Sequence, residues 1–310
     1  MPGKTKSGAF QPKSHTGGCA PIAYLTECRR GHALLRDAAQ KACDQNLVAW
    51  QNLNMNKELH KKPAAKSRAR FYFPGKLGNG SEVRLPAEAA HHAARVLRLA
   101  VGEPVTLFDG HGGEFEARIT RMDRGEVTIK TGAHLSVERE APLEILLAQG
   151  LSSGDRMDLT LQKSVELGVA AIQPVSTERS VVKLKNERAA RRAEHWQNLV
   201  VSACEQCGRN RVPRVAPLLG FGEWLAQLAQ PRDERRLMLS PHAVVSLREL
   251  APSRDRVILL AGPEGGLAPG EAQAAQSRGF APVRLGPRVL RTETAALAAL
   301  AAMQALWGDF

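Results

Sequence analysis

No run of about 18 apolar residues occurs anywhere in the 310-residue sequence, so we expect no membrane-spanning helix. The first residues, MPGKTKSGAFQPK, lack the apolar centre of a secretory signal peptide. The sequence has only 5 cysteines, an odd number, which argues against a disulfide framework and favours a reducing compartment. These absences predict a cytoplasmic protein that has no membrane partner.

Two further signatures of ligand sites are missing. No G-x-x-x-x-G-K-S/T pattern occurs, which excludes a P-loop nucleotide hydrolase. Cys204 and Cys207 have the C-x-x-C spacing of zinc and thioredoxin sites, but no second cysteine pair has a similar spacing. We therefore expect no metal.

Positive charge is present and unevenly distributed. Residues 1–69 hold 12 Lys and Arg against 4 Asp and Glu, so +8 of the net charge of +12 lies there. Residues 1–66 show no pattern dense enough to close a core. We interpret them as a basic, disordered extension or as a mistaken upstream start, with Met55 as an alternative start, or else as an arm that binds phosphates.

Two domains are predicted after this extension. Over residues 67–140, short runs such as RFYF, EPVTLFDG and EVTIKTG alternate in polarity between turns, which is typical of a small β-barrel. One helix, AEAAHHAARVLRLA, interrupts it between Pro86 and Gly102. Over residues 141–310, buried strands alternate with helices, which predicts an α/β domain with a mostly parallel sheet.

The loop AGPEGGLAPGE follows a buried strand in the last quarter of the chain. Gly262, Gly265 and Gly266 lack Cβ atoms, so a ligand can approach the backbone closely. Glu264 repels phosphate, which favours a nucleoside without phosphates. The alternative is a tight structural turn.

A second loop, LGPRVLRTETAALAAL, leads into the final helix at residues 285–300. Either Thr292 or Thr294 can cap that helix. Arg288 and Arg291 stand beside the positive end of the helix dipole, which is unfavourable unless an anion is near. Glu293, a bound ligand or an RNA phosphate can supply the negative charge.

These two loops, in this order, resemble the RsmE family, the 16S rRNA (uracil(1498)-N(3))-methyltransferases of the SPOUT superfamily. QKSVELGVAAIQPVSTERSV, ACEQCGRNRVPRV and RFYFPG match further blocks of the family, so the resemblance covers Arg70 to Phe310. It implies a SPOUT-type α/β domain with a C-terminal trefoil knot, preceded by a PUA-like β-barrel that binds RNA. Periodicity alone would not predict a knot.

The resemblance implies that S-adenosylmethionine (SAM) lies bent among three loops of the knot. The donor carries no phosphate, which agrees with a glycine-rich loop that has no phosphate-binding lysine. By motif match, the implied cofactor-binding residues are Gly262, Pro263, Glu264, Gly265, Leu285, Gly286, Leu290, Thr292, Thr294 and Ala295. The third loop is implied at the end of the strand RLMLS, near Leu239, where the sequence SPHA does not match the family residue by residue.

The implied reaction is methylation of N3 of a uridine in 16S rRNA, on the assembled small ribosomal subunit. We expect Arg291 or Arg288 to stabilise negative charge on the oxygens of the base. Glu264 or Glu293 is the candidate proton acceptor, and the alternative for either is a purely structural role. Because SPOUT enzymes build the donor site at a dimer interface, a homodimer is also implied.

Residues that bind RNA are expected in both domains. Arg68 and Arg70 are predicted to bind phosphate, and Phe71 and Tyr72 to stack on a base, although Phe71 and Phe73 equally suit the core of a strand. In the second domain the candidates are Lys163, Arg179, Gln206 and Arg209. The alternatives are an ion pair between Lys163 and Glu166 and a solvated helix end for the others.

A different class of function fits the same pattern. The chain would then be an RNA-binding assembly factor that keeps the fold but has lost turnover. The intact GPEGG and RTETA loops argue against it, and donor binding separates the two hypotheses.

Overall fold

The computed structural model describes residues 68–184, 186–230, 233–253 and 256–310. The chain divides into two units, residues 1–67 and 68–310, and the predicted N-terminal extension lies outside the described residues. Over the described part, no helix is long and apolar enough to cross a membrane.

The first part of the described chain is a five-stranded sheet in the order β1-β3-β4-β5-β2. Its core contains Phe71, Val105, Leu107, Ile119 and Ile129, all essentially without exposed surface. The inward residues of β4 alternate with exposed ones, as expected for a sheet with one buried face, whereas four consecutive residues of β3 are buried. The strands are β1 (Arg70–Tyr72), β2 (Glu82–Arg84), β3 (Pro104–Phe108), β4 (Glu114–Asp123) and β5 (Glu126–Leu135).

The helix expected after Pro86 is present but changes its winding. It begins as α2 (Ala87–His91) and continues as a π-helix, η1 (His92–Val96). Arg98 then adopts a left-handed conformation with φ of 52°, which ends the helix before the predicted Ala100.

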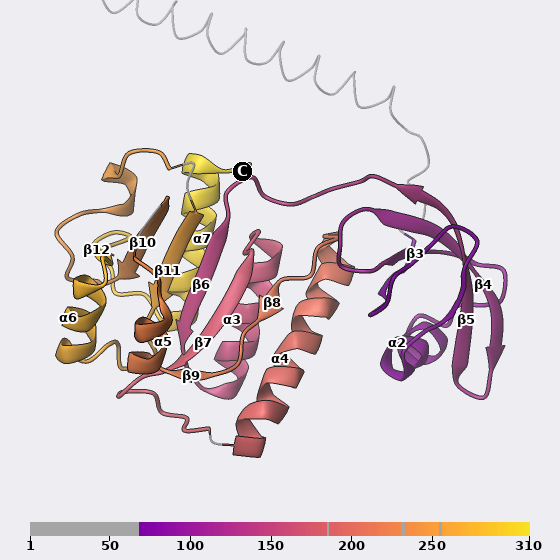
Figure 1. Ribbon diagram of the computed structural model, residues 1–310, viewed down its shortest axis with the longest axis horizontal. Coiled ribbons are helices and arrows are strands. Elements are labelled where there is room, and N and C mark those ends of the chain that lie inside the picture. The colour runs from indigo at the N-terminus through magenta and orange to yellow at the C-terminus, as the bar shows by residue number, and fades with distance from the viewer. Residues whose placement is uncertain (1–67, 185, 231–232, 254–255) are drawn as a thin grey trace, which may run out of the picture. The chain divides into compact units, whose positions relative to one another are not determined.

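The second part holds a parallel sheet in the order β12-β10-β11-β6-β7-β8, with β9 also paired to β7. Every pairing in it is parallel. The predicted α/β architecture is thus confirmed, and Figure 1 shows the strands between their helices. The strands are β6 (Ile145–Gly150), β7 (Ala171–Ser176), β8 (Arg214–Val215), β9 (Leu219–Gly220), β10 (Glu234–Leu239), β11 (Arg256–Ala261) and β12 (Ala281–Val283).

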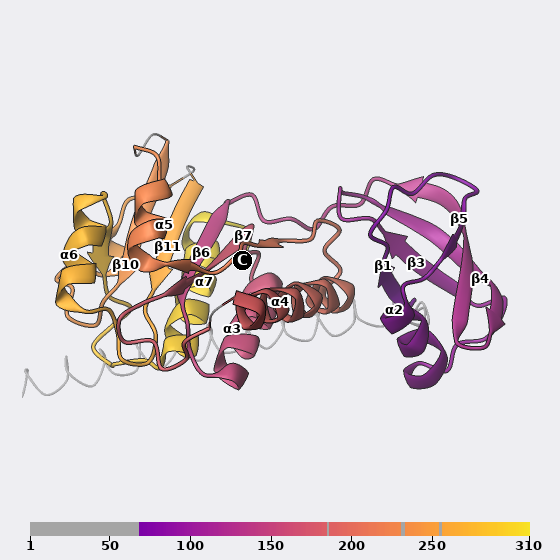
Figure 2. The ribbon, with the colours of Figure 1, turned by 60° about the horizontal axis from the view of Figure 1, so that its bottom comes forward.

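Helices cover both faces of this sheet, as Figures 1 and 2 show. Strand β11 illustrates why: Val257 and Leu259 face one helical layer, whereas Ile258 and Leu260 face the other. One layer holds α3 (Gly154–Glu166), α4 (Asn186–Cys207) and α7 (Thr292–Trp307). The other holds α5 (Phe221–Gln227) and α6 (Pro269–Ser277), and a short 3₁₀ helix, η2 (Leu247–Glu249), follows β10.

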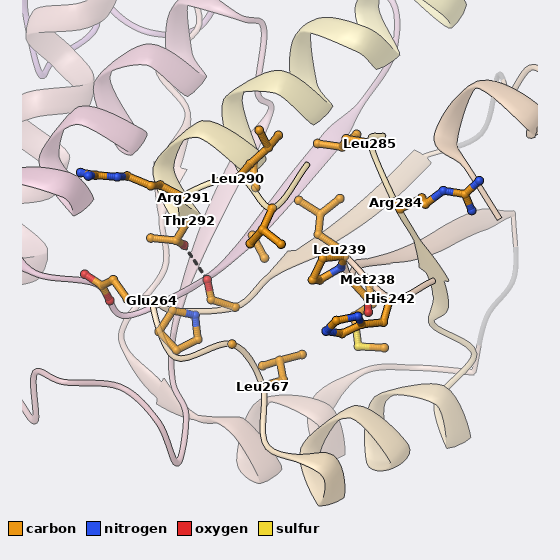
Figure 3. Close-up of a pocket in the computed structure, with 18 of the residues that line it drawn as sticks. Met238, Leu239, His242, Glu264, Leu267, Arg284, Leu285, Leu290, Arg291 and Thr292 are labelled. Atoms are coloured by element: carbon orange, nitrogen blue, oxygen red, sulfur yellow. Dashed lines mark hydrogen bonds between the residues drawn. The ribbon is translucent and has the colours of Figure 1, made fainter. Parts of the chain in front are cut away.

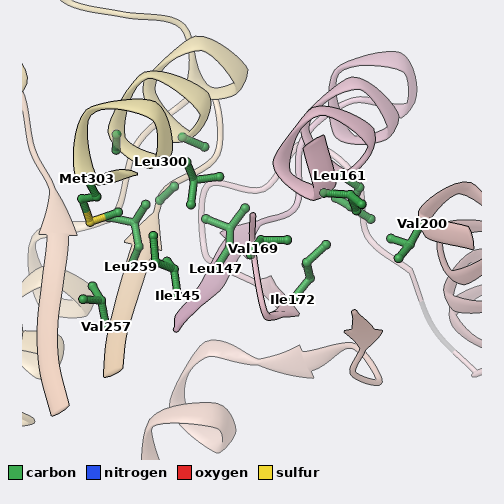
Figure 4. Close-up of a cluster of buried hydrophobic side chains, with 14 of the residues drawn as sticks. Ile145, Leu147, Leu161, Val169, Ile172, Val200, Val257, Leu259, Leu300 and Met303 are labelled. Carbon is green, nitrogen blue, oxygen red and sulfur yellow. The ribbon is translucent and has the colours of Figure 1, made fainter. Parts of the chain in front are cut away.

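The larger core lies under α3, α4 and α7 (Figure 4). Leu161 of α3, Val200 of α4 and Leu300 of α7 pack over Leu147 and Leu259 of the sheet, and all five are fully buried. The apolar final helix therefore serves the core of this chain along one face. The trefoil knot stays a prediction.

Candidate cofactor site

A cavity of about 730 Å³ lies where three neighbouring parallel strands end. In open parallel sheets, ligands bind beyond the carboxyl ends of the strands. The loops after β10, β11 and β12 form most of its wall, and the start of α7 completes it (Figure 3). The three loops implied by the family resemblance are therefore brought together.

Most of the predicted cofactor residues line this cavity. They are Leu239, Gly262, Pro263, Glu264, Gly265, Leu285, Gly286, Leu290, Thr292 and Ala295, joined by the candidate catalytic residues Arg288 and Arg291. Thr294 and Glu293 are not among the lining residues, and the buried Glu293 Oε2 has no hydrogen-bond partner within the described residues. Their predicted roles at the site stay predictions.

The GPEGG segment is both a tight turn and a cavity wall. The Gly266 N–H donates to the Pro263 carbonyl at 2.9 Å, and Gly266 has a φ of 67°, which favours glycine. A Cβ on Gly262 would stand 3.2 Å from the backbone of Gly266 and Leu267. The segment is therefore a structural turn and part of the ligand site at once, because the tight turn brings its backbone groups to the cavity.

Glu264 is held by two donors from the start of α3. Its Oε1 accepts the Ser153 N–H at 2.9 Å and a guanidinium N–H of Arg156 at 3.2 Å. Burial raises the pKa of the Glu264 carboxyl, but these hydrogen bonds outweigh burial, so the pKa lies below the ordinary value. A lowered pKa makes a weaker base, and the role of Glu264 as proton acceptor stays a prediction.

Thr292 does not cap the final helix through its side chain. It is the first residue of α7, and Arg291 occupies the cap position without a side-chain hydrogen bond. The Thr292 hydroxyl instead donates to the Gly262 carbonyl at 2.6 Å and accepts the side-chain N–H of Gln149 at 3.1 Å. Neither predicted threonine cap forms, and Thr292 joins the two loops of the cavity.

Arginine is the main charged residue of the cavity wall. Arg179 donates to the Gly265 carbonyl at 3.1 Å, and Arg284 donates to the carbonyls of Ala243 and Val244. Arg288 and Arg291 are exposed, and Figure 3 shows the Arg291 side chain pointing away from Leu239 and His242. Among the lining residues, Glu264 is the single carboxylate.

The chain matches the family model described as RNA methyltransferase domain over residues 139–304, and the RNA methyltransferase PUA domain over residues 85–131. It is 32% identical to ribosomal RNA small subunit methyltransferase E of Buchnera aphidicola subsp. Schizaphis graminum, over 77% of this chain and 97% of that protein. The chain belongs to the ribosomal RNA small subunit methyltransferase E family.

Two solved structures of high similarity hold the expected donor. The chain is similar to the methyltransferase E of Neisseria gonorrhoeae, solved with bound SAM, at 46% identity and a TM-score of 0.73, covering 78% of this chain and 99% of that one. A Legionella pneumophila methyltransferase, also solved with SAM, is 41% identical with a TM-score of 0.75 and the same coverage. The SPOUT-type α/β domain and the PUA-like domain that precedes it are thereby confirmed.

The cavity of this family member suits SAM. Its volume is within the range of sites for ligands of that size, and Met238, Leu239, Leu267 and Leu290 give it apolar walls. The Glu264 Oε2 is buried and has no hydrogen-bond partner within the described residues. It therefore leaves an acceptor for a donor group of the ligand.

Several residues predicted to contact RNA are buried in the protein interior instead. Arg209 is 6% exposed, pairs with Glu140, and donates to the carbonyls of Val165 and Val169, so its predicted role in RNA binding is wrong. Phe71 is fully buried in the sheet core and cannot stack on a base.

Arg70 is likewise held inside the protein. Its guanidinium bonds Glu114 at 2.5 Å and the Asn210 side chain at 2.6 Å, which leaves its side chain 12% exposed. Its predicted phosphate contact is therefore contradicted, because two polar partners and burial withhold the charge from RNA.

The remaining RNA candidates are at the surface. Arg68 is exposed beside Glu116, and Gln206 is exposed near the end of α4. Lys163 forms the expected ion pair with Glu166 at 2.7 Å. Arg179 lines the cavity, where its side chain can reach the cofactor loops and a bound substrate.

The two cysteines of the C-x-x-C pair differ in how deeply they are buried. Cys204 is fully buried, and burial raises the pKa of its thiol to about 12, whereas Cys207 is partly exposed. Within the described ranges, no group of three or more His, Cys, Asp and Glu side chains is arranged to hold a metal.

Sequence reasoning missed several residues of the site. Arg156 and His242 line the cavity, Ser153 holds Glu264 through its backbone, and Gln149 holds Thr292. The segment Ser240-Pro241-His242 follows β10 but carries no motif that assigns its residues. Gln149 stands in a strand and is marked only by being a polar residue in an apolar run.

Proposed function

We infer that the chain transfers a methyl group from SAM to ribosomal RNA of the small subunit. The observation that carries this inference is the cavity at the ends of β10, β11 and β12, in a chain 46% identical to a methyltransferase E solved with SAM. We further propose N3 of the uridine at position 1498 as the acceptor and the assembled small subunit in the cytoplasm as the substrate.

When bound, SAM supplies an electrophilic methyl group. The apolar side chains of Leu239, Leu267 and Leu290 exclude water from the cavity, and the backbone of the Gly262 turn presents hydrogen-bonding groups to it. Glu264 is proposed to accept a hydrogen bond from the donor molecule through its free Oε2, rather than to remove a proton.

Positive charge at the cavity suits the RNA. A SAM molecule carries a single carboxylate, whereas Arg156, Arg179, Arg288 and Arg291 all line the wall. We propose that Arg291 or Arg288 stabilises negative charge on the oxygens of the target base, and that Arg179 contacts RNA phosphate. Arg68, Lys163 and Gln206 remain proposed RNA contacts.

We propose that the active form is a homodimer. Val244 and Val289 are 88% and 76% exposed, in segments that adjoin or form the cavity wall, and Leu306 of α7 is 48% exposed. We propose that these exposed apolar side chains contact the second copy of the chain. Light scattering on the eluted protein tests the proposal, and a mass of one chain would contradict it.

The decisive test incubates the protein with labelled SAM and small subunits that lack the modification. Mass spectrometry of 16S rRNA fragments then locates the methyl group, with naked 16S rRNA as a parallel substrate. Methyl on N3 of uridine 1498 in subunits supports the proposal. A methyl group on another atom would overturn the proposed acceptor atom. If calorimetry detects no binding of SAM, the chain is better explained as a non-catalytic assembly factor.

A further inference from the structure

Gln149 joins the two cofactor loops through a directional hydrogen-bond chain. It lies next to the end of β6, is fully buried, and pairs in register with Ala261 of β11. Its amide Nε2 donates to the Gly150 carbonyl at 3.0 Å and to the Thr292 hydroxyl at 3.1 Å. Both amide hydrogens are thereby used.

The direction of this chain follows from the chemistry of its members. A hydroxyl has one hydrogen to donate. Because Thr292 accepts from Gln149, its own hydrogen is free to reach the Gly262 carbonyl, at 2.6 Å. A carbonyl can only accept, so the order from Gln149 through Thr292 to Gly262 is fixed.

The packing leaves little room for another arrangement. A Cβ on Gly150 would stand 2.7 Å from the nitrogen of Pro263, so β6 and the turn after β11 are in close contact here. The Gln149 Oε1 is buried and has no partner within the described residues, so the amide is retained at the cost of an unsatisfied acceptor. Both amide hydrogens of Gln149 are used while its oxygen is unpaired, which indicates that the fold requires Gln149 as a hydrogen-bond donor.

We propose that Gln149 is a positioning residue for SAM binding: it directs the Thr292 hydroxyl onto the Gly262 carbonyl and thereby sets the backbone of the cavity wall. Gln149 does not line the cavity, so it acts through the loops. The inference rests on the proposed SAM site. It goes beyond that site by assigning a buried strand residue that no cofactor motif contains.

Two substitutions at Gln149 separate donor function from packing. Gln149→Leu removes the amide, and we expect SAM affinity to fall about tenfold, the scale of one lost hydrogen bond to a buried partner. Gln149→Glu behaves differently with pH. A protonated carboxyl donates to Thr292, whereas a carboxylate can only accept and would take the hydroxyl hydrogen away from Gly262.

The expected readout is a pH profile of SAM binding, measured by calorimetry without RNA. Affinity of the Gln149→Glu protein should rise towards wild type as pH falls, while Gln149→Leu stays weak throughout. Glu264, Arg288, Arg291 and Glu293 flank the joined residues in the two loops, so the wild-type protein is measured at every pH as the baseline.

Thr292 supplies the matched pair. Thr292→Ser keeps the hydroxyl and should bind SAM nearly as wild type does, whereas Thr292→Val keeps the shape and should lose affinity. Melting temperatures of all variants verify that they fold. If both Gln149 variants bind SAM as tightly as the wild-type protein at every pH, the positioning role is overturned. If the wild-type protein itself does not bind SAM, the proposed function fails instead.

Discussion

The carboxylate of Glu140 lies 2.5 Å from the guanidinium of Arg209, whose side chain is 7% exposed. The same guanidinium donates to two carbonyls at the end of α3 and just beyond it, Val165 and Val169. A residue that reads in the sequence as an RNA contact is therefore a buried link between α3 and the segments before β6 and after α4.

Arg209→Ala should destabilise the protein by about 3 kcal/mol or more, because it leaves a carboxylate and two carbonyls without their buried partner. Urea unfolding measures the change. Arg68→Ala is the matched control, since it breaks an exposed pair with Glu116 and should cost less than about 1 kcal/mol. Equal costs for the two variants would contradict the buried role of Arg209.

Glu264→Gln should remove an acid-sensitive contribution to stability. The folded pKa of Glu264 is lowered, so its stabilisation is present above the ordinary value of 4.5 and is lost as pH falls through the lowered pKa. The melting temperature of wild type should exceed that of Glu264→Gln at neutral pH, and the gap should narrow on acidification below pH 4.5. Glu223→Gln, on the exposed side of α5, is the control. A gap that widens with acid would reverse the assignment.

Arg291→Ala should lower turnover about 10²-fold while SAM affinity stays near that of wild type. The reason is that Arg291 is exposed at the cavity with its guanidinium directed away from Leu239, where it can meet the RNA. Single-turnover methylation and calorimetry measure the two quantities, and Arg291→Lys tests whether charge alone suffices. Turnover near wild type in Arg291→Ala would exclude the role.

Arg179→Ala should weaken RNA binding and reduce its salt dependence by about one counterion. SAM affinity should fall only modestly, through the lost contact with the Gly265 carbonyl. Arg248→Ala removes an exposed arginine that does not line the cavity, and its salt dependence should match wild type. If the dependence of RNA affinity on salt concentration is unchanged in Arg179→Ala, Arg179 does not contact RNA phosphate.

Much of the fold could be predicted because its signals are local. The strand and turn patterns between Phe71 and Glu138 predict the first sheet, and the alternation after Leu143 predicts the parallel one. Gly168, with a φ of 79°, stands just beyond the end of α3, where its residue type predicts a helix stop. Arg98 was not predictable, because a left-handed arginine has no residue-type signal.

The candidate site was predictable to the extent that its residues are contiguous. Leu239 ends β10, and the GPEGG loop and the segment from Leu285 to Thr292 come after β11 and β12, so parallel pairing brings them to one edge of the sheet. The sequence could not show which of Thr292, Glu293 and Thr294 faces the cavity, because the start of α7 fixes the direction of these neighbouring side chains.

The sequence by itself determined the succession of strands and helices, the glycine-rich turn and the family, because each depends on residue types within one short segment. Only the tertiary structure decided which polar side chains are free. Arg156 meets Glu264 across 108 residues of chain, and Gln149 meets Thr292 across 143. Hydrogen bonds over such separations depend on the packed positions of β6, α3 and α7, and residue type alone does not distinguish a buried arginine such as Arg209 from one that faces RNA.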